Sequence, residues 1–229
     1  MRIGIIGAMS IEVEALKEKL EDSREETVSG IDFFCGRLCG KDVVIAKCGI
    51  GKVFAAICAQ TMILRFGVTH IINTGIAGTL TEELDILDVA IANGVVQHDM
   101  DTSPIGDPVG LISGINMVTL PTSLKMGEIA EAVANELGIK SRRGIVASGD
   151  QFISSSERKD FIKNTFGAVC CEMEGAAIGQ VCYVNGVDFV IIRCISDNAS
   201  GEAEMEYPEM VKIAAAKSQQ LVEAILERI

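Results

Sequence analysis

Short apolar runs alternate with helical patterns along the whole chain, and most of the apolar runs end in a glycine or a polar turn. The first run, 3–6, ends at Gly7, and apolar residues then recur at helical spacing from Ile11 to Leu20, with Ser10 as the expected N-cap. No repeat, low-complexity tract or shift in composition interrupts the pattern. Strands that alternate with helices form layered α/β structures. The sequence therefore predicts one α/β domain over residues 1–229, a three-layer α/β/α arrangement with a mixed central sheet.

The same pattern predicts the remaining elements. Strands are expected at 31–38 and 43–47, joined by a turn at Gly40, and at 68–73, 86–96, 144–147, 168–171 and 187–195. Helices are expected at 52–66, 122–137, 155–164, 175–183 and 208–228, with the serines at 154–156 as a cap. Prolines, glycines and acids fill 97–116, which we expect to be a long functional loop.

Charge and cysteine content limit the partners and the compartment. The chain has 20 basic and 32 acidic residues, a net charge of −12, which disfavours nucleic acid and anionic membranes as partners. No apolar run approaches the ~20 residues of a membrane-spanning helix, and the N-terminus lacks a signal-peptide pattern. The eight cysteines form no CxxC pair. We expect buried, reduced thiols and a cytoplasmic protein.

Ligands of open α/β folds bind at the carboxyl ends of strands, so the strand-end loops define the candidate site. These loops are 7–12, 49–52, 74–78, 148–153, 172–175 and 193–198. They contain no GxGxxG, GxxxxGK[ST] or GxSxG pattern, which argues against dinucleotide, P-loop and serine-hydrolase chemistry. The turn before Lys52 either holds an anion at a helix N-terminus or is only a tight turn with Lys52 in solvent.

The two histidines give little support for proton or metal chemistry. His70 lies inside an expected strand and is interpreted as a core residue. His98 begins the sequence His-Asp-Met-Asp, which is a weak metal pattern and is interpreted as a polar loop. We therefore expect no metal.

Carboxylates remain as the groups that could act as acid and base. Glu12 opens a helix, Glu172 and Glu174 flank Met173 at a strand-to-helix junction, and Asp197 follows the most apolar strand. The helix dipole alone explains an acid at position 12, and surface charge or capping could explain the other three. Spacing alone leaves both interpretations open.

Six motifs, in this order, decide between them. They are IGIIGAM with Glu12, GIGKV at 49–53, INTG at 72–75, SGD with Phe152 and Ile153, EME at 172–174, and RCISD at 193–197. Together they resemble the bacterial 5′-methylthioadenosine/S-adenosylhomocysteine nucleosidases of the nucleoside phosphorylase superfamily. The resemblance implies a homodimeric hydrolase of methionine salvage and methyl-cycle detoxification. It would cut the N-glycosidic bond of a 5′-thioadenosine, with adenine and thioribose as products and without cofactor or metal.

The resemblance also implies roles for individual residues. Glu12 would activate the attacking water, Asp197 would protonate adenine N7, and Glu174 would hold the ribose hydroxyls. Phe152 would stack on the base, and Ile153 would bond its edge through the backbone. The further substrate-binding positions are Met9, Ile76, Ala77, Gly78, Glu172, Met173, Arg193, Ser196 and Tyr207, and the partner subunit would contribute Thr102 and Ile105.

Three positions depart from the family pattern. Ile76 stands where many relatives carry a serine, and Thr102 and Ile105 differ from common pocket residues. The preference among 5′-methylthioadenosine, S-adenosylhomocysteine, 5′-deoxyadenosine and aminodeoxyfutalosine therefore stays open. Two alternatives also remain, a purine nucleoside phosphorylase and a non-catalytic nucleoside sensor. The loop 7–12 offers a carboxylate and no arginine, which favours water over phosphate as the acceptor.

Overall fold

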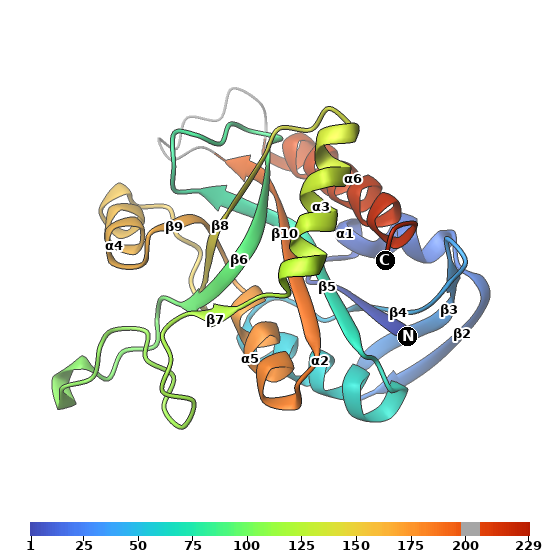
Figure 1. Cartoon of the computed structure of the whole chain (residues 1–229), viewed down its shortest axis with the longest axis horizontal. Coiled ribbons are helices and arrows are strands. Elements are labelled where there is room, and N and C mark those ends of the chain that lie inside the picture. The colour runs from blue at the N-terminus through green and yellow to red at the C-terminus, as the bar shows by residue number, and fades with distance from the viewer. Residues whose placement is uncertain (198–206) are drawn as a thin grey trace.

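The computed structural model describes residues 1–197 and 207–229, with side chains for 1–197 and 209–229, and its core is one mixed sheet (Figure 1). The strands are β1 (Arg2–Gly7), β2 (Glu21–Val28), β3 (Ile31–Leu38), β4 (Lys41–Lys47), β5 (His70–Thr79), β6 (Val89–Gln97), β7 (Leu120–Pro121), β8 (Ser141–Ser148), β9 (Ala168–Glu172) and β10 (Asp188–Asp197). The helices are α1 (Ser10–Glu18), α2 (Lys52–Phe66), η1 (Ser103–Ile105), α3 (Leu124–Glu136), α4 (Ser156–Phe166), α5 (Gly175–Asn185) and α6 (Tyr207–Leu226).

The sheet has a parallel centre and antiparallel additions. Strands β4, β1, β5 and β10 run parallel in that order, as do β6, β8 and β9. Antiparallel pairings β10–β6 and β5–β9 join the two groups, while the β3–β4 and β2–β3 hairpins extend one edge. The carboxyl ends of β1, β5, β8, β9 and β10 thereby come close together, as the sequence predicted for the site.

Helices cover both faces of this sheet. Helices α1, α3 and α6 pack on one face, where α1 and α6 contribute Val13, Leu16 and Leu221 to a core with Ile5 and Ile192. Helices α2 and α5 pack together on the other face, and α4 lies against β8 and β9 (Figure 1). The expected three-layer α/β/α arrangement is confirmed. Within the described residues, no helix combines the length and the apolar character that spanning a bilayer requires.

Several local expectations were wrong. β2, whose residues are mostly exposed and charged, pairs with β3 although no apolar alternation marks it. β5 continues through 74–78, which we expected to be a loop, because β10 pairs with it along that stretch. Met9, rather than Ser10, precedes the first turn of α1 as its N-cap. His70 is only half-buried at the start of β5, where its Nδ1 lies 2.9 Å from the Thr69 hydroxyl.

The cysteines largely follow the expectation. All eight are free thiols, and six are buried, among them the adjacent Cys170 and Cys171. Cys35 is half-buried and Cys39 is exposed in the β3–β4 turn, so these two are exceptions to the predicted burial. Burial raises the pKa of the Cys182 thiol to about 12, which keeps it protonated and unreactive.

Candidate active site

A cleft opens where the carboxyl ends of the strands meet. Glu12, Glu172, Glu174 and Asp197 all line it, so the fold brings together the four carboxylates singled out from the sequence. The other lining residues are Ala8, Met9, Ile50, Ile76, Ala77, Gly78, Gln151, Phe152, Ile153, Cys171, Met173 and Ser196. Ala8, Ile50, Gln151 and Cys171 were not predicted as site residues, although each lies in or beside a strand-end loop named above.

Glu12 sits in the first turn of α1 with its carboxylate buried in the cleft wall. Its Oε2 accepts N–H bonds from Ala8 (2.7 Å) and Met9 (2.9 Å), and Oε1 accepts one from Ile76 (3.1 Å). A Cβ at Gly75 would lie 2.5 Å from Oε1, so this glycine permits the close approach. Burial raises the pKa of Glu12, although Arg193 and the three backbone N–H groups oppose the rise. Three of its roughly four acceptor positions are filled, which leaves one for a ligand or water.

Glu172 and Arg193 form a buried ion pair beneath the cleft. The guanidinium of Arg193 donates from Nε to Glu172 Oε2 (3.1 Å) and from Nη2 to Asn73 Oδ1 (2.6 Å), with a second bond from Nη2 to Glu172. The Ser148 hydroxyl and the backbone N–H groups of Glu174 and Gly175 also donate to Glu172. Burial works to raise the pKa of Glu172, but Arg193 and these donors hold it below its usual value. Arg193 does not line the cleft and supports it from below.

Glu174 is the N-cap of α5 and reaches the start of α2. Its Oε1 accepts the N–H of Gly51 (2.9 Å), and its Oε2 lies 3.7 Å from Arg193 Nη2. Burial and the charge of Glu172 raise the pKa of Glu174 to about 7. The Gly51 N–H at the start of α2 is therefore bonded to a side chain of the chain itself, and the binding of a separate anion at this turn stays a prediction.

Asp197 is the last residue of β10 and lines the cleft. Its Oδ1 accepts a hydrogen bond from the Ser196 hydroxyl (3.0 Å), and its Oδ2 lies 3.9 Å from the ammonium of Lys159. A Cβ at Gly78 would lie 2.8 Å from Oδ2, so the carboxylate rests against bare backbone. Asp197 and Glu12 thus face the same cleft from different strand ends.

The loop after β8 forms the apolar end of the cleft. Phe152 is 67% exposed and Ile153 is half-buried, so the loop offers an aromatic face to a ligand. Asp150 ties the loop down: its Oδ1 accepts the N–H of Lys52 (2.8 Å), and its own N–H donates to Asp99 Oδ2 (2.9 Å). Asp99 Oδ1 in turn lies 2.6 Å from Lys52 Nζ. The alternative interpretation of the turn, which placed Lys52 in solvent, is therefore wrong.

The remaining predicted residues lie elsewhere. Thr102 and Ile105 belong to the segment around η1, which projects away from the body (Figure 1), and neither lines the cleft. Ile105 is 82% exposed. The Tyr207 side chain lies outside the described residues. No group of three or more metal-ligating side chains occurs in the described ranges, and His98 is buried behind Gly149.

Comparisons with known proteins agree over the whole chain. A family model described as the phosphorylase superfamily matches residues 2–227. A 5′-methylthioadenosine/S-adenosylhomocysteine nucleosidase of Halalkalibacterium halodurans is 42% identical over 229 residues, covering 100% of this chain and 99% of that one. The crystal structure of the Campylobacter jejuni protein of the same name is 36% identical with a TM-score of 0.95, covering 100% of both chains. A Helicobacter pylori structure described as a futalosine hydrolase is also 36% identical, with a TM-score of 0.94 and coverage of 100% and 98%.

Proposed function

Because the chain belongs to the 5′-methylthioadenosine/S-adenosylhomocysteine nucleosidase family of the phosphorylase superfamily, we propose that it hydrolyses the N-glycosidic bond of both these nucleosides. The products are adenine and the 5-thioribose. The observation that carries the proposal is the convergence of Glu12, Glu174 and Asp197 on one cleft. We also infer that residues 1–229 form a single domain of this enzyme.

The proposed reaction needs a base, an acid and a site for positive charge. Water attacks the anomeric carbon and gives a proton to Glu12, whose pKa is raised by burial, which makes its carboxylate a stronger base. The electrons of the breaking C1′–N9 bond pass to the purine, and Asp197 supplies a proton to N7 so that adenine leaves neutral. No cofactor or metal takes part in this scheme.

The buried charges favour the ribosyl cation of such a transition state. Glu12, Glu172 and Glu174 are buried around Arg193, so three acids face one base. Among these acids, Glu172 bonds directly to the Arg193 guanidinium and compensates its charge. The raised pKa values of Glu12 and Glu174 show that negative charge on these two groups is disfavoured without a cation nearby, and a developing oxocarbenium ion in the cleft would stabilise it.

The same cleft favours water over phosphate. Among the described residues that line it, none is lysine or arginine, and Arg193 is committed to its own partners. A phosphorylase needs cationic donors for its phosphate, usually arginine. We infer that the purine phosphorylase alternative does not apply.

Substrate binding follows from the two ends of the cleft. We assign Phe152 to stacking on adenine and the Ile153 backbone to its edge, while Met9 and Tyr207 would line the ribose and the alkylthio group. Ile76 lines the cleft and brings a bulky apolar side chain to the place where many relatives have serine. The Helicobacter pylori similarity makes aminodeoxyfutalosine the second candidate substrate, since it is also a 5′-modified adenosine.

We further propose a cytoplasmic homodimer. Helix α2 exposes Val53, Ile57 and Leu64, which lie four and eleven positions apart and so share one side of the helix. Val184 is also exposed, on α5, which packs beside α2. An apolar face of this kind suits a second copy of the chain, whose η1 segment could then deliver Thr102 and Ile105 to the neighbouring cleft. The free thiols agree with a reducing compartment.

The purified chain tests the proposal directly. It is mixed with 5′-methylthioadenosine, S-adenosylhomocysteine, 5′-deoxyadenosine or aminodeoxyfutalosine, each with and without phosphate, and free adenine is followed. We expect adenine release at a rate indifferent to phosphate. Phosphate-dependent formation of a ribose 1-phosphate would identify a phosphorylase, and binding without any release would identify a sensor.

A further inference from the structure

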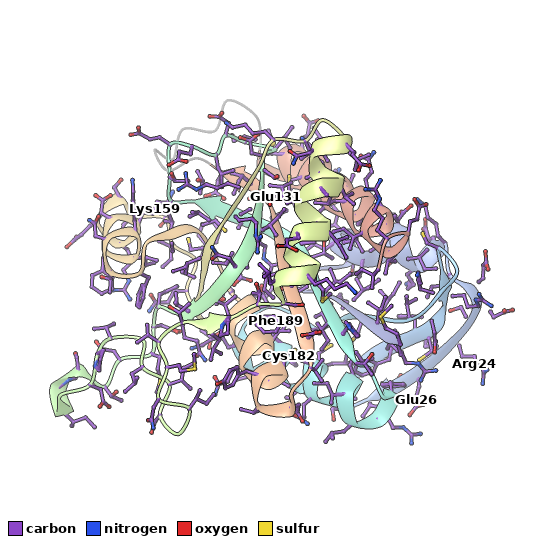
Figure 2. All side chains as sticks on the ribbon, in the orientation of Figure 1. Arg24, Glu26, Glu131, Lys159, Cys182 and Phe189 are labelled. Carbon is purple, nitrogen blue, oxygen red and sulfur yellow. The ribbon has the colours of Figure 1, made fainter. Side chains whose placement is uncertain are left out.

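A buried lysine that the proposed chemistry does not use lies behind Asp197. Lys159 comes from α4, the short helix against β8 and β9, on which Figure 2 labels it. Its Nζ is 3.9 Å from Asp197 Oδ2, and its side chain is only 6% exposed. Lysine ammonium groups are rarely buried to this extent unless an anion compensates their charge. Asp197 is such an anion when ionised.

The groups around Asp197 leave Lys159 as its charge partner. On β10, the neutral Ser196 hydroxyl donates to the other carboxylate oxygen, and on β5 Gly78 contributes only backbone. On β9, Cys171 faces both charges, but burial, together with the charge of Asp197, raises the pKa of its thiol to about 12, so the thiol stays neutral. Within the described residues, Lys159 supplies the only cationic atom within 4 Å of Asp197.

Lys159 does not line the cleft in which we place the substrate. It is absent from the residues that line the cleft, whereas Asp197 lines it. A charge placed behind a carboxylate interacts most strongly when water is excluded around both groups, and here the Asp197 side chain is 23% exposed. Lys159 therefore lies behind Asp197 rather than in the cleft wall, and we expect its effect on the reaction to act through that carboxyl group.

We propose that Lys159 is a positioning residue that stabilises the negative charge formed on Asp197 when its carboxyl proton passes to the leaving purine. This inference rests on the proposed function. In the step concerned, the O–H bond of Asp197 breaks, an N7–H bond forms, and the C1′–N9 electron pair moves into the purine ring. Asp197 becomes a carboxylate as the bond breaks, and the Lys159 ammonium already lies 3.9 Å from Oδ2, one of the two oxygens that share the new charge.

The proposal predicts a dependence on the leaving group. Adenine requires protonation to leave, so Asp197 changes its charge during the reaction. A 4-nitrophenyl 5-methylthioriboside releases a stable phenolate and needs no proton, so Asp197 keeps its charge throughout. Lys159 should therefore matter for the first substrate and not for the second.

Lys159→Met tests this, with Lys163→Met as its control because Lys163 is an exposed lysine one turn further along the same helix. With 5′-methylthioadenosine we expect K159M to lower kcat about tenfold, which is less than the loss expected when the acid itself is removed, with KM within about threefold. With the nitrophenyl substrate, K159M should stay within about twofold of the unaltered chain. Lys159→Arg should recover most of the activity on 5′-methylthioadenosine, and K163M should match the unaltered chain on both substrates.

Three results would overturn the inference. These are an equal loss on both substrates, no loss on either, or failure of K159R to recover activity that K159M has lost. If K159M does not fold, Lys159→Gln removes the same charge but keeps a polar side chain. Turnover of the nitrophenyl substrate shows whether a variant has folded. Failure of the proposed function gives a different result, since the unaltered chain would then release no adenine.

Discussion

Asp197 and Glu12 have chemically distinct tasks, so replacing each carboxylate by its amide separates them. The amide keeps the size of the side chain and can still accept a hydrogen bond from Ser196 or from Ala8, but it cannot donate or take the reacting proton. We expect Asp197→Asn and Glu12→Gln each to lower adenine release by at least about 100-fold, the range for lost acid–base catalysis. The nitrophenyl substrate distinguishes them, because only E12Q should impair its hydrolysis. Full activity in either variant would remove that residue from the mechanism.

Protonation of Glu174, a residue of the proposed site, should make the stability of the chain depend on pH. Its pKa is raised from 4.5 to about 7 in the folded chain, so the folded state binds the proton more tightly than the unfolded state. Its contribution is therefore present below pH 4.5 and lost as the pH rises through about 7. The loss amounts to at most roughly 3 kcal/mol in the free energy of unfolding.

Glu174→Gln removes this dependence because the amide oxygen can still accept the Gly51 N–H. The free energy of unfolding is measured with urea at pH 5 and at pH 8. It should decrease less from pH 5 to pH 8 for E174Q than for the unaltered chain. The kcat of E174Q should also be lower. Glu172→Gln is the matched control. It breaks the pair with Arg193 and should destabilise the chain at pH 8, since the pKa of Glu172 is held low. A parallel decline for E174Q and the unaltered chain would contradict the assignment.

The N-terminus of α2 forms hydrogen bonds with two parts of the cleft wall, Glu174 and the loop after β8. The Gly51 N–H donates to Glu174, and the next residue, Lys52, holds the loop after β8 through Asp150 and Asp99. A Cβ at Gly51 would lie 2.9 Å from Asp150 Oδ1, so the two elements meet closely here. Loosening this junction should displace the aromatic end of the cleft without touching the acid or the base.

Asp99→Asn tests this junction. The amide cannot accept from both Lys52 and Asp150, so we expect KM for 5′-methylthioadenosine to rise about tenfold, equivalent to ~1.4 kcal/mol of binding, with kcat changed less than about threefold. Asp101→Asn is the control, because Asp101 lies on the same loop, is exposed, and accepts the N–H of Ser103 within that loop. A fall in kcat with unchanged KM would place Asp99 in a different role.

Element order and the location of the cleft could be predicted because they depend on local periodicity and on the rule that ligands bind at strand ends. β2 could not, since an exposed edge strand needs no apolar pattern and is held by pairing with β3. The contact of Lys159 with Asp197 was equally hidden: nothing near Lys159 in the sequence shows that α4 packs its lysine behind the end of β10. Tertiary packing decides which charged residues from distant parts of the chain meet in the interior, and a single sequence does not show that packing.

The exposed apolar face of α2 and α5 has no explanation within a single copy of the chain. Val53 is 69% exposed and Leu64 is 74% exposed, and burying both against a second copy would remove a large apolar area from water. Val53→Asp places a charge in that proposed interface. We expect light scattering to show the unaltered chain as a dimer and V53D as a monomer, with adenine release reduced because the partner's η1 segment is lost.

Two further variants test whether the loss of activity in V53D comes from the proposed interface and from the η1 segment. Ile213→Asp introduces the same charge at an exposed apolar position of α6, on the opposite layer, and should leave a fully active dimer. Ile105→Asp should also stay dimeric, but it should raise KM more for S-adenosylhomocysteine than for 5′-deoxyadenosine, because only a long 5′ substituent would reach the partner's loop. An unaltered chain that is monomeric and fully active would show that one copy completes the site, and Ile105 would then have no part in it.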